Sequence, residues 1–238
     1  MFWRKKPQNL QFWSTVDYLN DPALEYLRPQ PASKFFPEWM KSIPKQSREG
    51  FTAKQCPAFA EFLTQGYVIP LWQDYTIKFE QDGTFSYYCR VNDNQMKLDA
   101  HPNWQYIDHL PKNHNTLATL KFLSPWRIKT PKGWSCYQMP FYYHFFDWHL
   151  LPGSIRTDQH YEITAQVAFP KTYMGKEITI TQGTPISWYI PYKRETLDLE
   201  HIDYDPAMTD ASWFISTSKF SGGYMNYAKK DKKDSKKG

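Results

Sequence analysis

The sequence predicts a mainly β fold, and three observations lead to this prediction. Aromatic residues make up 18% of the 238 residues, with 10 Trp and 17 Tyr, and aromatic side chains favour strands because they pack well on a pleated surface. From residue 117 onward, short segments of alternating apolar and polar residues follow one another. Pro and Gly turns separate these segments without helical patterns between them, which is typical of a β-sandwich or barrel.

The strands expected after residue 117 cover residues 119–130, 133–143, 145–151, 161–169, 177–182 and 185–193. In the segment 161–169, Ile163, Ala165, Val167 and Phe169 recur at every second position, so they should share the buried face. Pro185 and Pro191 limit the last segment to a short strand that suits a sheet edge. Upstream, residues 67–91 alternate around a "QDG" hairpin turn. The polar stretch 92–116 contains His101, His109 and His114 and is expected to be a loop.

The chain is expected to have three parts. Residues 1–50 form a Pro-rich aromatic arm that packs across the main domain or a neighbouring subunit, with short helices near Pro22–Leu27 and Phe36–Ile43. Residues 51–228 form the β domain, which begins with a helix at 56–66 ended by Gly66. Residues 229–238 form a Lys-rich tail that is expected to be disordered and dispensable for folding.

Charge and cysteine content exclude several classes of protein. The formal net charge is +5, but the tail contributes +4 and the cations at positions 4–6 contribute +3, so the rest of the chain carries −2. A specific nucleic-acid interface would spread its cations over a folded face, so none is expected. The three cysteines are far apart, which argues against disulfides and zinc modules and indicates a reducing compartment. The sequence shows neither a signal peptide nor an apolar run that could span a membrane, so a soluble intracellular protein is expected.

The search for catalytic and metal motifs leaves one candidate metal set. The chain lacks the motifs GxSxG, GxGxxG, HExxH and the P-loop. The stretch "HFFDWH" offers His144, Asp147 and His149, two imidazoles and a carboxylate that could hold iron. Strand geometry would point His144 away from the other two side chains, so the alternative is that these residues are the polar ends of an aromatic strand. The residues indicate no particular cofactor.

Six tryptophans allow a second interpretation, a platform on which a sugar or a base stacks. Their spacing is irregular, and the alternative is that they pack in the core and at its rim. The six are Trp72, Trp104, Trp126, Trp134, Trp148 and Trp188.

Residues 118–195 resemble the dUTP pyrophosphatase and dCTP deaminase superfamily. The superfamily pattern Gly-x-Ile-Asp-x-Asp-Tyr-x-Gly-Glu-Ile aligns with residues 153–163, and the pattern x-Ile-x-x-Gly-Asp-x-Ile with the segment that begins at Ile180. Residues 130–140 resemble the superfamily strand that precedes its phosphate-binding Arg-Ser. The resemblance implies a jelly-roll-like barrel of the dUTPase type. It also implies a homo-oligomer, and a trimer is the first expectation because members of the superfamily are often trimeric.

The departures from this pattern argue against the superfamily's reaction. Arg156 stands where the pyrophosphatases have the aspartate that activates water, and Gln159 replaces the tyrosine that stacks on deoxyribose. Phe141 and Tyr142 stand where the Arg-Ser grips phosphate. A cation cannot act as a general base and phenyl rings cannot cradle phosphate. The resemblance therefore implies the fold without the chemistry.

The chain as a whole resembles an uncharacterised family found in phages and bacteria. The motifs "FFPEWMKSIP", "CPAFAEFLTQGYVIPLWQDYTI", "LKFLSPWRIKTPKGWS", "PGSIRTD" and "ITQGTPISWYIPYKRE" carry this resemblance, over residues 35–195. It implies a phage-encoded protein located in the host cytoplasm or in the virion. The expected function is a non-catalytic binding or assembly module. Two alternatives stay open: an enzyme that uses the set at 144–149 or Asp158, and a nucleotide- or sugar-binding protein without turnover.

The remaining candidate ligand-binding residues surround the stretch "PGSIRTDQHYEI" at 152–163. They are Arg156, Asp158, His160, Lys193 and Arg194. Lys193 and Arg194 could hold an anion, or they could pair with Asp158 and Glu162, and pairing is preferred because the sequence has no phosphate loop beside them. We expect a structural hairpin in which Asp158 bonds backbone N–H groups. Gly153 and Gly183 are expected where a turn needs positive φ or close backbone approach.

Overall fold

The structure of the chain is a computed structural model that describes residues 9–48, 50–208 and 210. These residues divide into two compact units, the first with residues 9–37 and 65–194 and the second with residues 38–64 and 195–210. The first unit consists mainly of antiparallel strands, and its helices are short 3₁₀ helices. The expectation of a mainly β protein is therefore confirmed. The predicted arm, residues 1–50, is shared between the two units.

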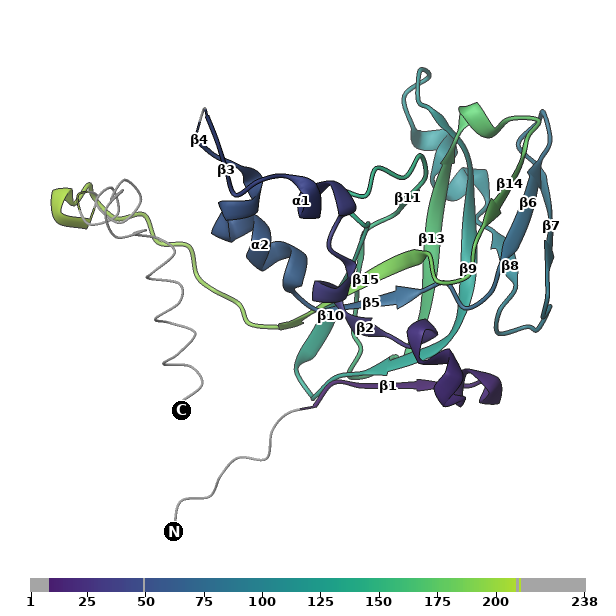
Figure 1. Cartoon of the computed structure of the whole chain (residues 1–238), viewed down its shortest axis with the longest axis horizontal. Coiled ribbons are helices and arrows are strands. Elements are labelled where there is room, and N and C mark those ends of the chain that lie inside the picture. Colours follow the sequence, from purple (N-terminus) through teal and green to yellow (C-terminus); the bar gives the residue numbers. More distant parts are fainter. Residues whose placement is uncertain (1–8, 49, 209, 211–238) are drawn as a thin grey trace, which may run out of the picture. The chain divides into compact units, whose positions relative to one another are not determined.

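The first sheet has two long paired strands, β9 and β13, at its centre (Figure 1). Its strands are β1 (Gln11–Ser14), β9 (Thr116–Lys129), β13 (Glu162–Pro170) and β11 (His149–Leu150), and β8 (Leu98–Ala100) also pairs with β9. The alternation predicted for residues 161–169 is confirmed, because Ile163, Ala165, Val167 and Phe169 are at most 3% exposed. The register shifts opposite Pro125, where the missing N–H would interrupt a regular ladder.

Two further sheets complete the first unit. The second sheet has the order β12 (Gly153–Ile155), β10 (Trp134–Met139), β15 (Pro185–Lys193), β5 (Tyr67–Pro70), β2 (Gln30–Pro31). The third has the order β14 (Glu177–Ile180), β6 (Tyr75–Phe79), β7 (Phe85–Cys89). Within the described residues each sheet is open, with end strands that have one partner only, and none closes into a barrel. The expected jelly-roll-like barrel is therefore not confirmed.

The strand β15 is central rather than at an edge, so that prediction was wrong. It lies between β10 and β5. The pairing with β5 ends at Tyr189, whereas the pairing with β10 continues to Lys193. At Pro191, β15 therefore has a partner strand on one side only. A sheet accommodates proline at such a position because no partner needs its missing N–H.

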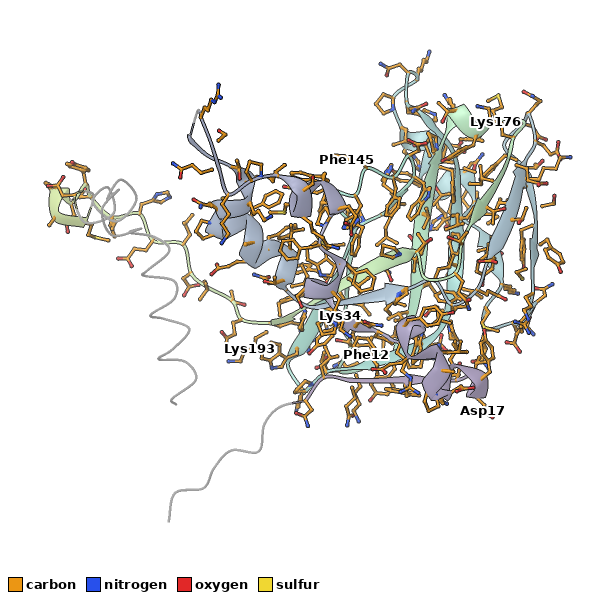
Figure 2. All side chains as sticks on the ribbon, in the orientation of Figure 1. Phe12, Asp17, Lys34, Phe145, Lys176 and Lys193 are labelled. Carbon is orange, nitrogen blue, oxygen red and sulfur yellow. The ribbon has the colours of Figure 1, made fainter. Side chains whose placement is uncertain are left out.

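Part of the N-terminal region packs directly on the sheets of the first unit. Strand β1 pairs with β9 and strand β2 pairs with β5. Phe12, labelled in Figure 2, contacts Tyr67 edge to face with ring centroids 5.6 Å apart. The predicted turn of helix at Pro22–Leu27 is present as a 3₁₀ helix, and the Asp21 carboxylate accepts a hydrogen bond from Ala23 N at its start.

Aromatic side chains fill the core of the first unit. The largest wholly buried ones are Trp72, Trp188, Tyr75, Tyr189, Phe79, Phe122 and Phe169. Of the six tryptophans considered as a stacking platform, Trp72, Trp126, Trp148 and Trp188 are at most 8% exposed, whereas Trp104 is 65% exposed. The six therefore do not form one exposed platform, and the core interpretation is confirmed for four of them.

The segment between β10 and β11 departs from the predicted strands. Residues 133–143 and 145–151 were expected to be extended, but β10 ends at Met139 and β11 contains only His149 and Leu150. Tyr143 has φ 69° and Phe145 has φ 55°, in the left-handed region. Extended backbone cannot continue through such residues, so the aromatic pattern predicted strands where a loop forms.

The second unit contains the other two predicted helices, α1 (Glu38–Ser42) and α2 (Pro57–Thr64), and a small sheet of β3 (Gln46–Ser47) and β4 (Gly50–Phe51). The rings of Trp39 and Phe59 pack edge to face at 6.3 Å. The Lys54 ammonium donates to the carbonyl oxygens of Lys41 at 2.8 Å and Ile43 at 3.2 Å. The predicted tail, residues 229–238, lies outside the described residues. No helix in the described part of the chain is both long enough and apolar enough to span a membrane.

Candidate ligand-binding site

The stretch 152–163 forms β12, a tight turn and the start of β13. The turn is closed by hydrogen bonds of 2.9 Å from Gln159 N and His160 N to the Arg156 carbonyl oxygen. Thr157 is wholly buried, and its hydroxyl lies 2.7 Å from the hydroxyl of Thr130. The turn is thus bonded to the segment that links β9 to β10.

Asp158 and Arg194 form a two-pronged ion pair at this turn. The distances are 2.9 Å from Arg194 Nη1 to Asp158 Oδ1 and 2.5 Å from Nη2 to Oδ2. Gly133 N donates to Asp158 Oδ2 at 2.9 Å. The Asp158 side chain is only 3% exposed and that of Arg194 is 26% exposed. The preferred pairing of Arg194 with Asp158 is confirmed, whereas Glu162 pairs with Arg127 at 3.4 Å.

Arg194 also connects the ion pair to β10. Its Nη1 donates to Trp134 O at 2.8 Å and to Ser135 Oγ at 2.7 Å, and its backbone N–H donates to Gly133 O. The Asp158–Arg194–Gly133 cluster therefore joins three segments: the turn after β12, the start of β10 and the end of β15.

This geometry makes Asp158 a poor proton acceptor. The hydrogen bond from the Arg194 side chain, followed by the Gly133 N–H and the guanidinium charge, lowers the pKa of Asp158 from 3.8 to about 2. A general base needs a pKa closer to the working pH and a lone pair aimed at a substrate. Both Asp158 oxygens are instead directed at groups of the protein.

The other candidates lie on the outside of this cluster. Arg156 and His160 are exposed on the turn. Lys193, labelled in Figure 2, is exposed at the end of β15. Gly183 has φ +84°, as expected. Gly153 does not have a positive φ, and no neighbouring heavy atom lies within 4 Å of the position a Cβ would take, so its prediction was wrong. It is simply the first residue of β12.

The proposed metal ligands are not brought together. His144 Nε2 lies 2.9 Å from the Phe35 carbonyl oxygen, Asp147 accepts a 3.4 Å hydrogen bond from the Tyr173 hydroxyl, and His149 pairs with Ala168 in the β11–β13 ladder. Among residues 9–48, 50–208 and 210, no group of three His, Cys, Asp or Glu side chains is placed to hold a metal ion.

The buried cysteines are not set up as nucleophiles. Cys136 is wholly buried, and this burial raises the pKa of its thiol to about 11, although the Thr157 hydroxyl donates to its sulfur. Burial also raises the pKa of Cys89. A thiolate is the reactive form, so these environments disfavour nucleophilic chemistry at both residues.

A cavity of about 280 Å³ lies elsewhere in the first unit, and the sequence did not predict it. It is bounded by the β6–β7 turn, by the segment after β8 and by the first half of β9, elements that Figure 1 shows beside one another. The residues that line it are Asp82, Gly83, Thr84, Phe85, Ala100, His101, Pro102, Asn103, Ala118, Thr119 and Leu120.

Two polar atoms of residues that line this cavity have no hydrogen-bond partner within the described part of the chain. They are the Thr119 hydroxyl, on a residue that is 2% exposed, and His101 Nδ1. Both atoms have almost no accessible surface, so they do not face the open space of the cavity, and they are exceptions to the rule that buried polar groups are paired. His101 was noted in the sequence only as part of a polar loop, and a histidine followed by proline carries no signal for such a site.

Comparison with known proteins finds structural neighbours but no family. No family model matches the chain, and no curated protein matches it. Among solved structures, the chain is similar to a mutant dUTPase of Staphylococcus bacteriophage 80alpha determined with dUpNHpp. The match has 10% sequence identity and a TM-score of 0.26, and it covers 48% of this chain and 91% of that chain.

Proposed function

We propose that this chain is a non-catalytic binding or assembly module. The observation that carries the proposal is the Asp158–Arg194–Gly133 cluster. The carboxylate that the sequence aligns with the superfamily pattern is 3% exposed and is bound by a guanidinium and a backbone N–H, which supports a structural role for it. Arg156 and Gln159 occupy the aligned positions that would carry the chemistry.

The proposal includes the finer assignments drawn from the sequence. In it, residues 118–195 have a scaffold of the dUTPase type, and the chain is phage-encoded and acts in the host cytoplasm or in the virion. These assignments rest on the resemblance of the motifs quoted above. The 280 Å³ cavity favours a module that binds a small ligand without converting it.

The absence of the superfamily's reactions is the first expected result. Purified protein should release no pyrophosphate from dUTP and no ammonia from dCTP above the rate of a heat-denatured sample, because both oxygens of Asp158 are bound by Arg194 and Gly133 and its pKa is lowered. A known dUTPase and a known dCTP deaminase serve as positive controls for the two assays. Turnover proportional to protein concentration, and absent in Asp158→Asn, would contradict the non-catalytic role.

A homo-oligomer is the second expected result, and it rests on the superfamily resemblance alone. Light scattering of the full chain should give a mass near a multiple of 28.4 kDa, with three copies as the first expectation. A mass of one chain that persists at high protein concentration would refute the oligomer. It would not test ligand binding, which needs a separate experiment.

A further inference from the structure

We propose that single-stranded nucleic acid binds, without sequence specificity, to one end of the first unit. The basic patch at this end is defined by Lys129, Lys132 and Arg156, all of which are exposed. Phosphates contact these cations, and bases stack on Trp13 and Tyr137. The inference rests on the binding role proposed above and names the partner of that role.

Lys129 and Arg156 are brought together by contacts between the residues that follow them. Lys129 precedes Thr130, and Arg156 precedes Thr157. Thr130 N donates to Thr157 O at 3.1 Å, and the two hydroxyl oxygens lie 2.7 Å apart. The end of β9 is therefore bonded to the turn after β12, and the two cations lie at the same end of the unit.

Lys132 is held at this end by the Asp158–Arg194–Gly133 cluster. It precedes Gly133, whose N–H donates to Asp158 Oδ2 at 2.9 Å. Asp158 is in turn two residues beyond Arg156. The cluster thus fixes the link between β9 and β10 against the turn after β12, and this gathers the three cations from two separate segments.

The acidic groups beside the basic patch are bound by arginines outside it. Asp158 is held by Arg194, and its side chain is 3% exposed. Glu162 pairs with Arg127 at 3.4 Å. None of the ion pairs in the described part of the chain involves a cation of the patch. Exposed cations that are not offset in this way attract phosphate groups.

Trp13 provides an exposed ring beside Lys129. It lies in β1, is 39% exposed, and contacts Tyr161 edge to face with ring centroids 5.6 Å apart. The Lys129 ammonium lies 5.6 Å from the centre of the same Tyr161 ring. Trp13 and Lys129 are therefore neighbours. An aromatic ring next to a cation can stack a base and contact the adjoining phosphate, as in proteins that bind single strands.

Tyr137 provides a second exposed ring on the strands beside the turn. It is 45% exposed and stacks on Tyr192 with ring centroids 4.1 Å apart. The Tyr192 hydroxyl lies 2.7 Å from the hydroxyl of Ser154, two residues before Arg156. The neighbouring tyrosine and this hydrogen bond hold the pair in place, which lowers the entropy that Tyr137 loses when a base stacks on it.

The combination of cations and rings favours a single strand over other polyanions. A duplex would also contact the cations, but its bases are stacked on one another and cannot stack on Trp13 or Tyr137. An acidic peptide would use the charges without the rings. Every base has a flat face, so binding by stacking and phosphate contacts does not depend on sequence.

The test measures the fluorescence anisotropy of a labelled oligothymidylate of about 15 nucleotides, titrated with the full chain at several salt concentrations. The wild type should bind it, and the affinity should fall as salt is raised. Lys129→Gln/Lys132→Gln should weaken binding by roughly tenfold at low salt. The slope of log affinity against log salt should become shallower by about 1.4, which is about 0.7 for each lost phosphate contact.

Lys171→Gln/Lys176→Gln is the matched control. Both lysines are exposed in the first unit outside the segments that form the patch, and Lys176, labelled in Figure 2, directly precedes β14. The two double variants lose the same charge and keep the Lys-rich tail, so the difference between them reports the patch alone. The control should bind the oligonucleotide as the wild type does.

Trp13→Leu tests the stacking. Loss of the ring should weaken binding by roughly tenfold and leave the salt slope unchanged, because no charge is removed. Trp13→Phe keeps an aromatic ring and should retain most of the affinity. Melting temperatures of all variants check that each is folded. A merely structural role for Trp13 would not separate affinity from the salt slope in this way.

Three outcomes would overturn the proposal. They are the absence of oligonucleotide binding by the folded protein, equal affinity of the two lysine double variants, and binding of a duplex or of polyglutamate as tightly as of the single strand. Each would remove single-stranded nucleic acid as the partner while the non-catalytic role stands. Nucleotide turnover by the same sample would instead contradict that role, so the two failures are distinguishable.

Discussion

Replacing Gly66 by alanine is expected to destabilise the protein by about 4 kcal/mol or more. Gly66 follows α2 and precedes β5, and its φ is +70°. A Cβ at this position would lie 2.1 Å from the Tyr189 carbonyl oxygen and 3.0 Å from Ile190 Cα. Both contacts are with the backbone of β15, a central strand, so relief requires a shift of the strand rather than of a side chain.

The measurement is thermal or urea denaturation of the variant. A loss of this size should lower the melting temperature by about 10 °C or more in a chain of this length. Gly153→Ala is the matched control, because a Cβ at Gly153 meets no heavy atom within 4 Å and its φ is not positive. That control should stay within about 0.5 kcal/mol of the wild type. Equal stability of the two variants would show that the close approach at Gly66 is not a constraint.

Local sequence patterns predicted the strands and helices that bury one face, and the elements that end at a glycine. Strand β13 was predicted by apolar residues at every second position, and α2 by its helical spacing and by Gly66, whose positive φ ends it. The β6–β7 turn was predicted by "QDG", and Gly83 indeed has φ +84°. In each case the physical cause lies within a few residues of the element it determines.

Elements determined by distant residues were not predictable in the same way. Strands β1 and β2 are four and two residues long, and only pairing with β9 and β5 makes them strands. The aromatic segment 145–151 has strong strand propensity, yet its first residue, Phe145, adopts a positive φ, as does Tyr143 just before the segment. Propensity measures fit to a pleated surface, and tertiary contacts override it.

The candidate sites show the same division. Asp158 was predicted to have a structural role through nearby backbone donors, and Arg194 was predicted to pair with it. Sequence could not supply Gly133, which is 25 residues away and donates to the same carboxylate. The cavity was missed because it needs three separate segments, and its polar residues, Thr119 and His101, are adjacent only in the β8–β9 register.

Asp158→Ala is expected to lower the melting temperature by roughly 5 °C or more. The change removes the partner of the Arg194 guanidinium and leaves the Gly133 N–H without its acceptor. Removing one member of a buried pair is costly because the other charge remains in place. Three segments, namely the turn after β12, the start of β10 and the end of β15, lose their common contact.

The controls separate this cluster from the rest of the turn. Arg156→Ala changes an exposed side chain two residues away and should alter the melting temperature by a degree or two at most. Asp158→Ala and Arg194→Ala should be clearly non-additive in the double variant, because each removes the same interaction. If Asp158→Ala is neutral for stability but abolishes binding of a ligand, the turn is a binding site and the structural role is wrong.

The same ion pair should make stability depend on acid pH in a defined direction. The pKa of Asp158 is lowered from 3.8 to about 2 by the Arg194 hydrogen bonds, so its contribution is present above the unfolded value and is lost as the pH falls towards the folded value. The difference in urea midpoint between the wild type and Asp158→Asn should therefore be largest near neutral pH. It should shrink between about pH 4 and pH 2, where the wild-type carboxyl becomes protonated. A difference that stays constant over this range would show that the charge of Asp158 does not stabilise the fold.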